Sequence, residues 1–153
     1  MNEESVTIDA PVEQVWDLVT DVTKMGRFSP GNTGGKWLGG AKEPSVGAKF
    51  IGFNRRGVIR WATRCTVTEC EEPNRFAFQV TENNMQWGWR LEPAGSGTRL
   101  IQWRDRVKEP AAPIRVVANL LFRGNLEGEM ADGMRETLAK VKTVAENGSA
   151  PSA

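Results

Sequence analysis

The sequence predicts an α+β protein: an antiparallel sheet of about seven strands, followed by a long C-terminal helix. Three observations lead to this prediction. Alternating apolar runs fill residues 36–107, short turn sequences rich in Gly, Asn and Pro separate these runs, and a helical period extends from about Ile114 to Glu146. Consecutive strands with short connections are typical of an antiparallel meander. A chain of 153 residues is long enough for one domain with its own core.

The first strand and two short helices are predicted before the rest of the sheet. Val6 and Ile8 alternate with polar residues, which indicates a strand with one buried face. Pro11 suits the first position of a helix because the N–H that it lacks would be unpaired there. The apolar stripe of this helix consists of Val12, Val15, Trp16 and Val19. A second helical segment is expected near residues 22–25.

Six further strands are predicted from the runs KWL, AKFIGF, VIRWATRCTVTEC, RFAFQV, MQWGWRLEP and TRLIQWRDRV. The segment GNTGG, residues 31–35, is rich in glycine, but it does not join a strand to a helix as a phosphate-binding loop does. It is expected to be a flexible loop.

The C-terminal helical region contains Gly124, Gly128 and Gly133, each of which costs about 0.5 to 1 kcal/mol relative to alanine. Gly124 and Gly128 would share one helix face with Leu121. They would allow close approach of a strand, leave room for a ligand, or mark a break near residues 123–125 that gives two helices. We expect a single domain over residues 1–146 and a disordered tail over residues 147–153.

Two residue types that are common in active sites are missing, since the chain has no His and no Tyr. Ser-His-Asp and Cys-His nucleophile systems and His-ligated zinc are therefore excluded. The sequence also has no phosphate-loop or dinucleotide-binding motif. We therefore expect no metal and no cofactor.

Charge and hydropathy indicate an apolar small molecule as the partner. Twenty basic and nineteen acidic residues give a formal charge of +1, so nucleic acid is not an expected partner. No window is apolar enough for a membrane span and no leader-like pattern opens the chain, which predicts a cytoplasmic protein. Cys65 and Cys70 would lie about 16 Å apart on an extended strand, so both are expected to be reduced thiols. The oligomeric state is left open.

Four segments resemble a known family in their order and spacing. They are IDAPVEQVWDLVTD, VTECEEPNRFAFQV, WRLEPAGSGTRL and MRETLAKVKTVAE. Together they are similar to the START-like, or SRPBCC, helix-grip superfamily, and most to its polyketide cyclase/dehydrase-like branch. The resemblance implies a sheet that curves around the last helix, an elongated apolar cavity between them, and two small helices that seal one end of the cavity.

The strand faces are rich in aromatic side chains, and these give the candidate site. The candidate ligand-binding residues are Trp16, Trp61, Phe78, Trp87, Trp89, Trp103, Leu121, Gly124 and Gly128. Indoles on one face, opposite glycines on a helix, would leave space for a ligand. The alternative is that the aromatic side chains simply fill a core.

Asp105 is the candidate for acid–base chemistry. The strand face with Ile101, Trp103 and Val107 is the more apolar one, so Asp105 is expected to point inward with them. A carboxyl group among aromatic side chains has its charged form disfavoured and can transfer a proton. In the alternative, a bulge shifts the register and Asp105 pairs on the surface with Arg90 or Arg104.

Three functions remain after these exclusions. The first, which composition favours, is the binding of an apolar small molecule of lipid, polyketide or aromatic-ring type. The second is a cofactor-independent aromatase/cyclase or dehydratase that acts on a polyketide-like substrate. The third is a protein-interaction domain, which would need a large exposed apolar or charged patch.

Overall fold

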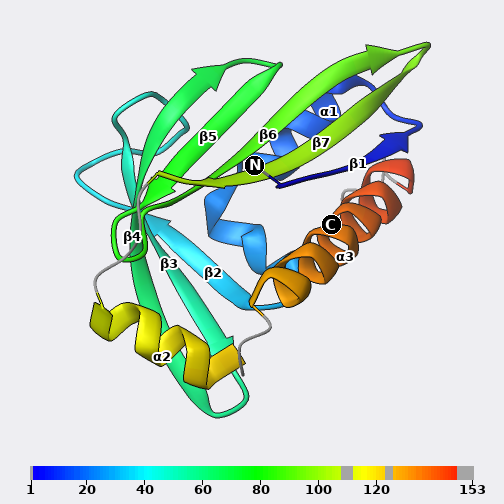
Figure 1. Ribbon diagram of the computed structural model, residues 1–153. Helices are drawn as coiled ribbons and strands as arrows, with labels where there is room; N and C mark the ends of the chain where they lie inside the picture. Colours follow the sequence, from blue (N-terminus) through cyan, green and yellow to red (C-terminus); the bar gives the residue numbers. More distant parts are fainter. Residues whose placement is uncertain (1, 108–111, 123–125, 148–153) are drawn as a thin grey trace.

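The computed structural model describes residues 2–107, 112–122 and 126–147. Figure 1 shows one sheet together with the helices that flank it. In chain order the elements are β1 (Asn2–Ile8), α1 (Val12–Val19), the 3-10 helix η1 (Val22–Arg27), β2 (Asn32–Trp37), β3 (Lys49–Arg56), β4 (Ile59–Glu71), β5 (Arg75–Val80), β6 (Met85–Ala94), β7 (Gly97–Arg106), α2 (Ala112–Phe122) and α3 (Leu126–Glu146).

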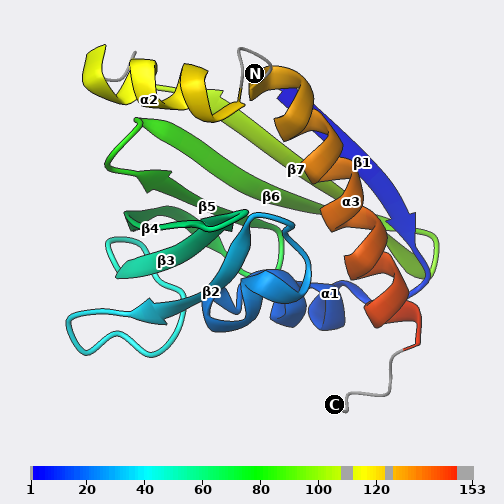
Figure 2. The same ribbon diagram turned by 90° about the horizontal axis from the view of Figure 1, so that it is seen from below.

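The seven strands form one antiparallel sheet in the order β1-β7-β6-β5-β4-β3-β2. The strands from β2 to β7 each pair with the next strand in the sequence, as a meander requires. Strand β1 lies at the edge of the sheet beside β7. The sheet is curved and α3 crosses its concave side (Figures 1 and 2). The predicted fold class and strand number are confirmed.

Two short helices lie between β1 and β2, as predicted. Pro11 occupies the cap position with ψ of 150°, so the helix begins one residue later than Pro11 itself. Val15, Trp16 and Val19 of α1 are buried in the core. Asp21 caps η1, because its carboxylate accepts a hydrogen bond of 3.2 Å from the Thr23 backbone N–H.

The expectation of a flexible loop over residues 31–35 is wrong, because β2 begins at Asn32. Gly35 explains the difference. A Cβ atom at this position would meet the Val22 carbonyl oxygen of η1 at 2.5 Å. Glycine here lets the backbone of η1 lie directly on β2, so Gly35 serves close packing.

Of the alternatives for the C-terminal region, the structure has two helices, α2 and α3, on either side of residues 123–125. Gly124 lies outside the described residues. Gly133 lies within α3, and a Cβ atom there would make only an ordinary contact of 3.6 Å with Pro30. Close approach therefore does not require a glycine at position 133.

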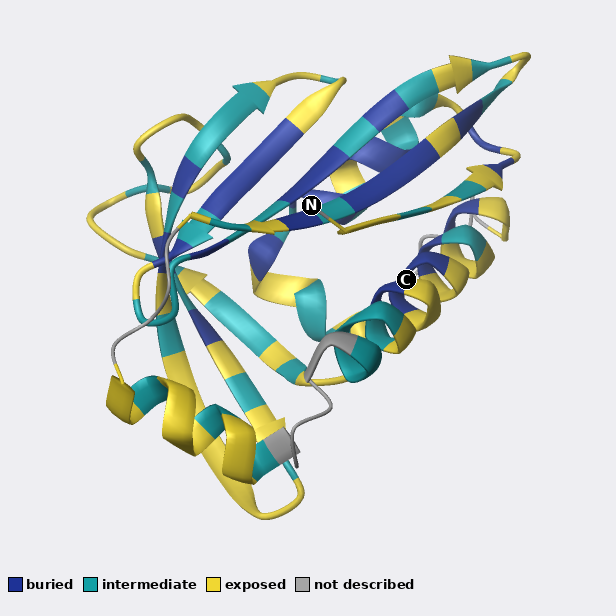
Figure 3. Ribbon diagram, in the orientation of Figure 1, coloured by how far each residue is buried: buried dark blue, intermediate teal, exposed yellow. Residues whose placement is uncertain are grey.

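The core lies between the concave side of the sheet and the two helices α1 and α3. We call this side the inner face and the opposite side the outer face. Buried side chains of the inner face pack with Trp16 of α1 and with Leu138 and Val141 of α3. Figure 3 shows the dark blue band of buried residues along the middle of the sheet and along the sheet-facing side of α3. The inner-face core residues are Phe50, Cys65, Val67, Phe76, Phe78, Trp89, Leu91 and Leu100.

Candidate ligand-binding face

The part of the inner face next to α1 is a filled aromatic core. Trp16 meets Phe76 edge-on with ring centroids 6.2 Å apart, and Phe50 meets Phe78 in the same way at 5.1 Å. Trp16, Phe78 and Trp89 are all buried. For these three candidate residues the structure favours the alternative that they fill a core.

Further along the inner face, buried polar groups replace the aromatic core. Gln102 and Arg104 of β7 are cross-strand neighbours of Trp89 and Trp87 of β6, so all four side chains share this face. Gln102 is 7% exposed and Arg104 is 2% exposed. Both polar side chains are thus held away from solvent inside a largely apolar protein.

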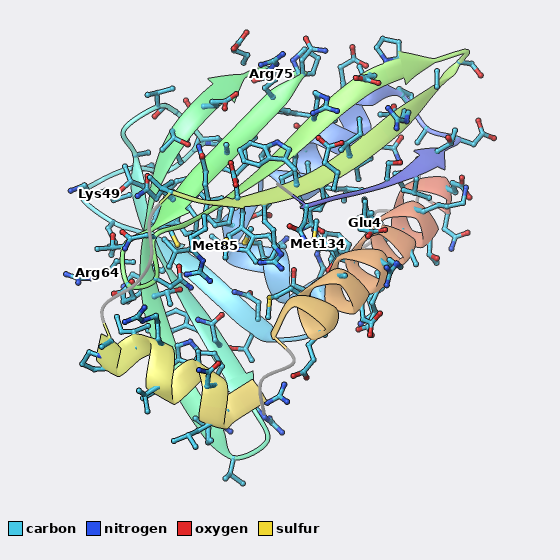
Figure 4. The ribbon with its side chains drawn as sticks, in the orientation of Figure 1. Glu4, Lys49, Arg64, Arg75, Met85 and Met134 are labelled. Atoms are coloured by element: carbon cyan, nitrogen blue, oxygen red, sulfur yellow. The ribbon has the colours of Figure 1, made fainter. Side chains whose placement is uncertain are left out.

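Arg104 lies among soft, polarisable groups. Its guanidinium carbon is 5.9 Å from the centre of the Trp87 ring, and its Nη1 is 3.9 Å from the Met85 sulfur. The first distance is within the range of a cation–π interaction. Met85 and Met134 of α3 are both buried, and Figure 4 shows them in the space between the sheet and α3. Methionine side chains of this kind adapt to ligands of irregular shape.

Gln102 has a buried hydrogen-bond acceptor with no partner. Its side-chain Oε1 atom makes no hydrogen bond to any of the residues that the structure describes. A buried carbonyl oxygen without a donor costs about 1 to 3 kcal/mol. Glu4 of β1 is the cross-strand partner of Gln102 on the same face. Its carboxylate forms an ion pair with Arg135 of α3 at 3.3 Å.

Beyond this region the inner face opens toward solvent at the β3–β4 hairpin. Trp61 is 37% exposed and is the cross-strand partner of Asn54. The Asn54 amide donates a hydrogen bond of 3.3 Å to the Thr63 hydroxyl. A surface pocket of about 460 Å³ at this hairpin takes residues from both faces. Asn54 and Trp61 come from the inner face and Phe53, Arg60 and Ala62 from the outer face, and Thr33 of β2 completes the lining. Trp61 is thus an accessible indole at the open end of the inner face.

The expectation that Asp105 points inward is wrong. Asp105 pairs with Gln86, is exposed, and lies on the outer face. Trp103 is also on the outer face, where it pairs with Gly88 and covers it. No bulge interrupts the pairing of β6 with β7. The physical reason is that the outer face is also packed here, with Ile101 fully buried, so the more apolar face of β7 is not the inner one.

An outer-face pocket of about 290 Å³ lies beside Trp103. It is lined by Glu69, Arg75, Gln86, Trp89, Arg90, Trp103 and Asp105. Several of its polar side chains already have partners. Arg75 lies 4.0 Å from the Glu69 carboxylate within the pocket, Gln86 donates to the Thr68 hydroxyl at 3.0 Å, and Arg90 contacts Glu3 and Glu92. Trp103 therefore has a different environment from the other candidate indoles.

The helical candidates lie near the open end. The Leu121 carbonyl accepts a hydrogen bond of 3.0 Å from Arg56 Nε at the end of β3. Gly128 is half-buried in α3 and precedes Glu129, whose carboxylate pairs with the same arginine at 2.8 Å. Arg56 thus joins the hairpin to both helices.

Sequence reasoning missed Gln102, Arg104 and Glu4 as inner-face residues. The signal was present, because Glu4 is in phase with the half-buried Val6 and the buried Ile8, and Gln102 and Arg104 are in phase with Leu100. The signal was overlooked because Glu4, Gln102 and Arg104 are polar, and polar residues are normally expected on the solvent side of a strand. Among the described residues, no cluster of three or more Cys, Asp or Glu could hold a metal ion, and no helix is long and apolar enough to cross a membrane.

Solved structures share this fold, whereas no curated protein matches the chain. The solution structure of the polyketide-cyclase-like protein Cgl2372 from Corynebacterium glutamicum is 29% identical, with a TM-score of 0.62 over 92% of this chain and 88% of that one. NE0264 from Nitrosomonas europaea is 15% identical, with a TM-score of 0.69 over 97% and 96% of the two chains.

The di-domain ARO/CYC protein StfQ of the steffimycin biosynthetic pathway is 14% identical, with a TM-score of 0.67. The match covers 96% of this chain and 45% of StfQ. At such identities StfQ and NE0264 share the fold alone.

The family model described as "Polyketide cyclase / dehydrase and lipid transport" matches residues 2–146. This match spans every strand and helix from β1 to α3. It confirms the resemblance that the four sequence segments indicated, and the solved relatives confirm the helix-grip architecture. The chain belongs to the polyketide cyclase/dehydrase and lipid transport family.

Proposed function

We propose that this protein binds an apolar small molecule of lipid, polyketide or aromatic-ring type against its inner face, and that Gln102 and Arg104 hold a polar group of that molecule. The observation that carries the proposal is the buried Gln102 Oε1 atom, which has no donor among the described residues. A ligand hydroxyl that donates to this oxygen would remove the cost of the unpaired acceptor.

The surroundings of Gln102 support a ligand that is mostly apolar. Trp87, Met85 and Met134 offer indole and thioether surface, and burial against such groups contributes about 25 cal/mol per Å². Arg104 supplies N–H donors beside the Gln102 acceptor, which suits a ligand with a carbonyl next to a hydroxyl. The exposed Trp61 gives an apolar surface at the end of the face through which a ligand would enter.

A matched pair of probes tests the hydrogen bond directly. 2-Naphthol and 2-methoxynaphthalene have the same rings, but only the first can donate a hydrogen bond. The parent protein should bind 2-naphthol more tightly by about 2-fold to 10-fold, as one hydrogen bond provides. The Gln102→Leu variant should lose this preference while it still binds the methoxy compound. Titration calorimetry measures both affinities.

The control variant is Gln86→Leu, which removes the same side chain from the outer face of the neighbouring strand. It should keep the preference for 2-naphthol. Equal affinities of the parent protein for the two probes, or the same loss in both variants, would contradict the proposal. Mass spectrometry of apolar extracts from the purified protein would identify a natural ligand.

An enzymatic role of cyclase or dehydratase type is the second candidate. Glu4 is the observation that favours it, because a carboxylate, an amide and a guanidinium lie at neighbouring positions of the inner face. Such a set could orient a polyketone and accept a proton from it. StfQ, a protein of the same fold, is described as an ARO/CYC protein. Conversion of a linear polyketone by the parent protein, and its loss in Glu4→Gln with unchanged binding, would support this role.

A further inference from the structure

We propose that the tip of the β3–β4 hairpin and helix α2 together form a docking surface for an anionic lipid bilayer. Large aliphatic side chains are exposed on both elements: Val58 at 97%, Leu120 at 76%, Val117 at 61%, Val116 at 58% and Ile59 at 49%. Exposed apolar groups gathered in this way are typical of an interaction surface. The inference goes beyond ligand binding and does not depend on it.

The hairpin presents its apolar residues at a protruding turn. Gly57 and Val58 form the two-residue connection between Arg56 and Ile59, which pair across the hairpin. Gly57 adopts a left-handed φ of +62°, which tight hairpin turns require. The Val58 side chain is consequently almost completely in solvent and makes no contribution to the core.

Helix α2 lies at the same end of the molecule. Its last turn is tied to the hairpin by the hydrogen bond from Arg56 Nε to the Leu121 carbonyl. Figure 1 shows α2 and the hairpin together at the bottom of the molecule, and Figure 3 shows that both are mostly exposed. A helix with this much apolar surface in solvent lacks the partner that would normally cover it.

The positive charge of the hairpin and α2 favours an anionic bilayer as the partner of this surface. Residues 53–64 and 112–122 contain five arginines and no Asp or Glu, although the whole chain is nearly neutral. The arginines are Arg55, Arg56, Arg60, Arg64 and Arg115. Arg56 and Arg64 pair with Glu129 and Glu82, whereas no ion pair is recorded for the other three with any described residue. Exposed cations beside aliphatic side chains fit the headgroups and upper acyl region of an anionic bilayer.

A second copy of the chain fits this surface less well than a bilayer does. A symmetric dimer would bring Arg55, Arg60 and Arg115 of both copies close together, and these two segments supply no carboxylate to offset the repulsion. A bilayer instead offers phosphates to the arginines and hydrocarbon to Val58, Val117 and Leu120. Arginine side chains near such an interface can extend toward the phosphates while their stems stay in the apolar layer.

Vesicle flotation tests the proposal. The parent protein should float with vesicles of phosphatidylcholine and phosphatidylglycerol and much less with phosphatidylcholine alone, and high salt should release it. Val58→Glu should weaken partitioning by about tenfold, because it removes an apolar contact and adds a repelled charge. Arg60→Gln and Arg115→Gln should each weaken it by about fivefold.

Two control variants make the same chemical changes elsewhere. Val46→Glu alters a valine that is 66% exposed in the connection between β2 and β3, and Arg75→Gln alters an exposed arginine on β5. Both should partition like the parent protein. Failure of the parent to bind anionic vesicles would overturn the proposal, and so would equal effects of Val58→Glu and Val46→Glu. A dimer in sedimentation that Val58→Glu dissociates, without vesicle binding, would assign the surface to self-association instead.

Discussion

The indole ring of Trp103 lies directly on Gly88, its cross-strand partner on the outer face of the sheet. A Cβ atom built at Gly88 would overlap the indole, so only glycine allows this contact. The arrangement gives the outer face its own apolar layer, which also includes the buried Ala77 and Ile101. Both faces of the sheet are therefore packed around β6 and β7.

Gly88→Ala should destabilise the protein by about 1 to 3 kcal/mol, because the indole must move away and uncover the strand beneath it. Denaturant unfolding at 25 °C measures the change. Gly31→Ala is the matched control, since a Cβ atom there would meet no atom within 4 Å, and it should leave stability almost unchanged. Equal stabilities of the two variants would mean that Trp103 is not held against Gly88.

The two cysteines should differ in their reactivity. Burial raises the pKa of the Cys65 thiol to about 12, an effect that a hydrogen bond with Thr63 opposes and the charge of Glu82 reinforces. Cys70 is half-buried, and its pKa is raised by burial and then by Glu72. At pH 8 a disulfide reagent should label Cys70 first, and Cys65 only when the protein unfolds. Rapid labelling of two thiols in the folded protein would contradict the burial of Cys65.

Cys65 should also make stability depend on alkaline pH. Its pKa is higher in the folded protein than its ordinary value of 9.0, so the unfolded chain releases the proton first. The stabilisation is complete below pH 9 and is lost as the pH rises from 9 toward 12. Cys65→Val should flatten this part of the stability profile, which urea unfolding at several pH values would measure.

Glu82 should contribute to stability at neutral but not at acid pH. Its desolvation raises the pKa, but hydrogen bonds of 2.9 Å from the Arg64 backbone N–H and from Arg64 Nε outweigh this and lower it. A lowered carboxyl pKa gives stability that is present above the ordinary value and is lost as the pH falls. Glu82→Gln should cost less than about 1 kcal/mol at pH 7 and nothing at pH 2.

The control for this variant is Glu43→Gln, which changes an exposed glutamate for which no ion pair is recorded among the described residues. Its unfolding free energy should follow that of the parent at both pH values. An equal loss of stability for Glu82→Gln at pH 2 would indicate that the amide disturbs packing rather than an ion pair.

The sequence was sufficient to predict most of the strands, because Val6, Ile8, Phe76 and Phe78 follow the two-residue period of a strand with one buried side, but it predicted a loop over residues 32–35 of β2. It was not sufficient to predict which side of β7 faces inward. Trp103 is more hydrophobic than Gln102, so hydrophobicity alone predicts that Trp103 faces the core. The pairing of Trp103 with Gly88 instead places the indole on the outer face. That information lies in the register between two strands, which no single-strand pattern contains.

The candidate site was harder to predict for the same reason. An aromatic residue looks alike in a filled core and in a binding surface, so Trp16 and Trp61 could not be separated until their exposures, 3% and 37%, were known. The buried Gln102 and Arg104 run against the rule that strongly polar residues lie outside. Such exceptions are detected only from packing.

The pairing of β1 with β7 affects how the chain folds during synthesis. Ile8 and Thr98 are cross-strand partners although they lie ninety positions apart in the sequence. Helix α3, which packs on β1, comes still later in the chain. Because β1 is made before the other strands of this domain and pairs only with β7, it has no hydrogen-bonding neighbour in the sheet until nearly the whole domain has been made. During that interval the backbone N–H and C=O groups of its VTI segment have no strand partner. Contacts between residues this far apart in the sequence also slow folding. Early chaperone contact with residues 2–8 would protect the nascent chain at the stage when it is most prone to aggregate.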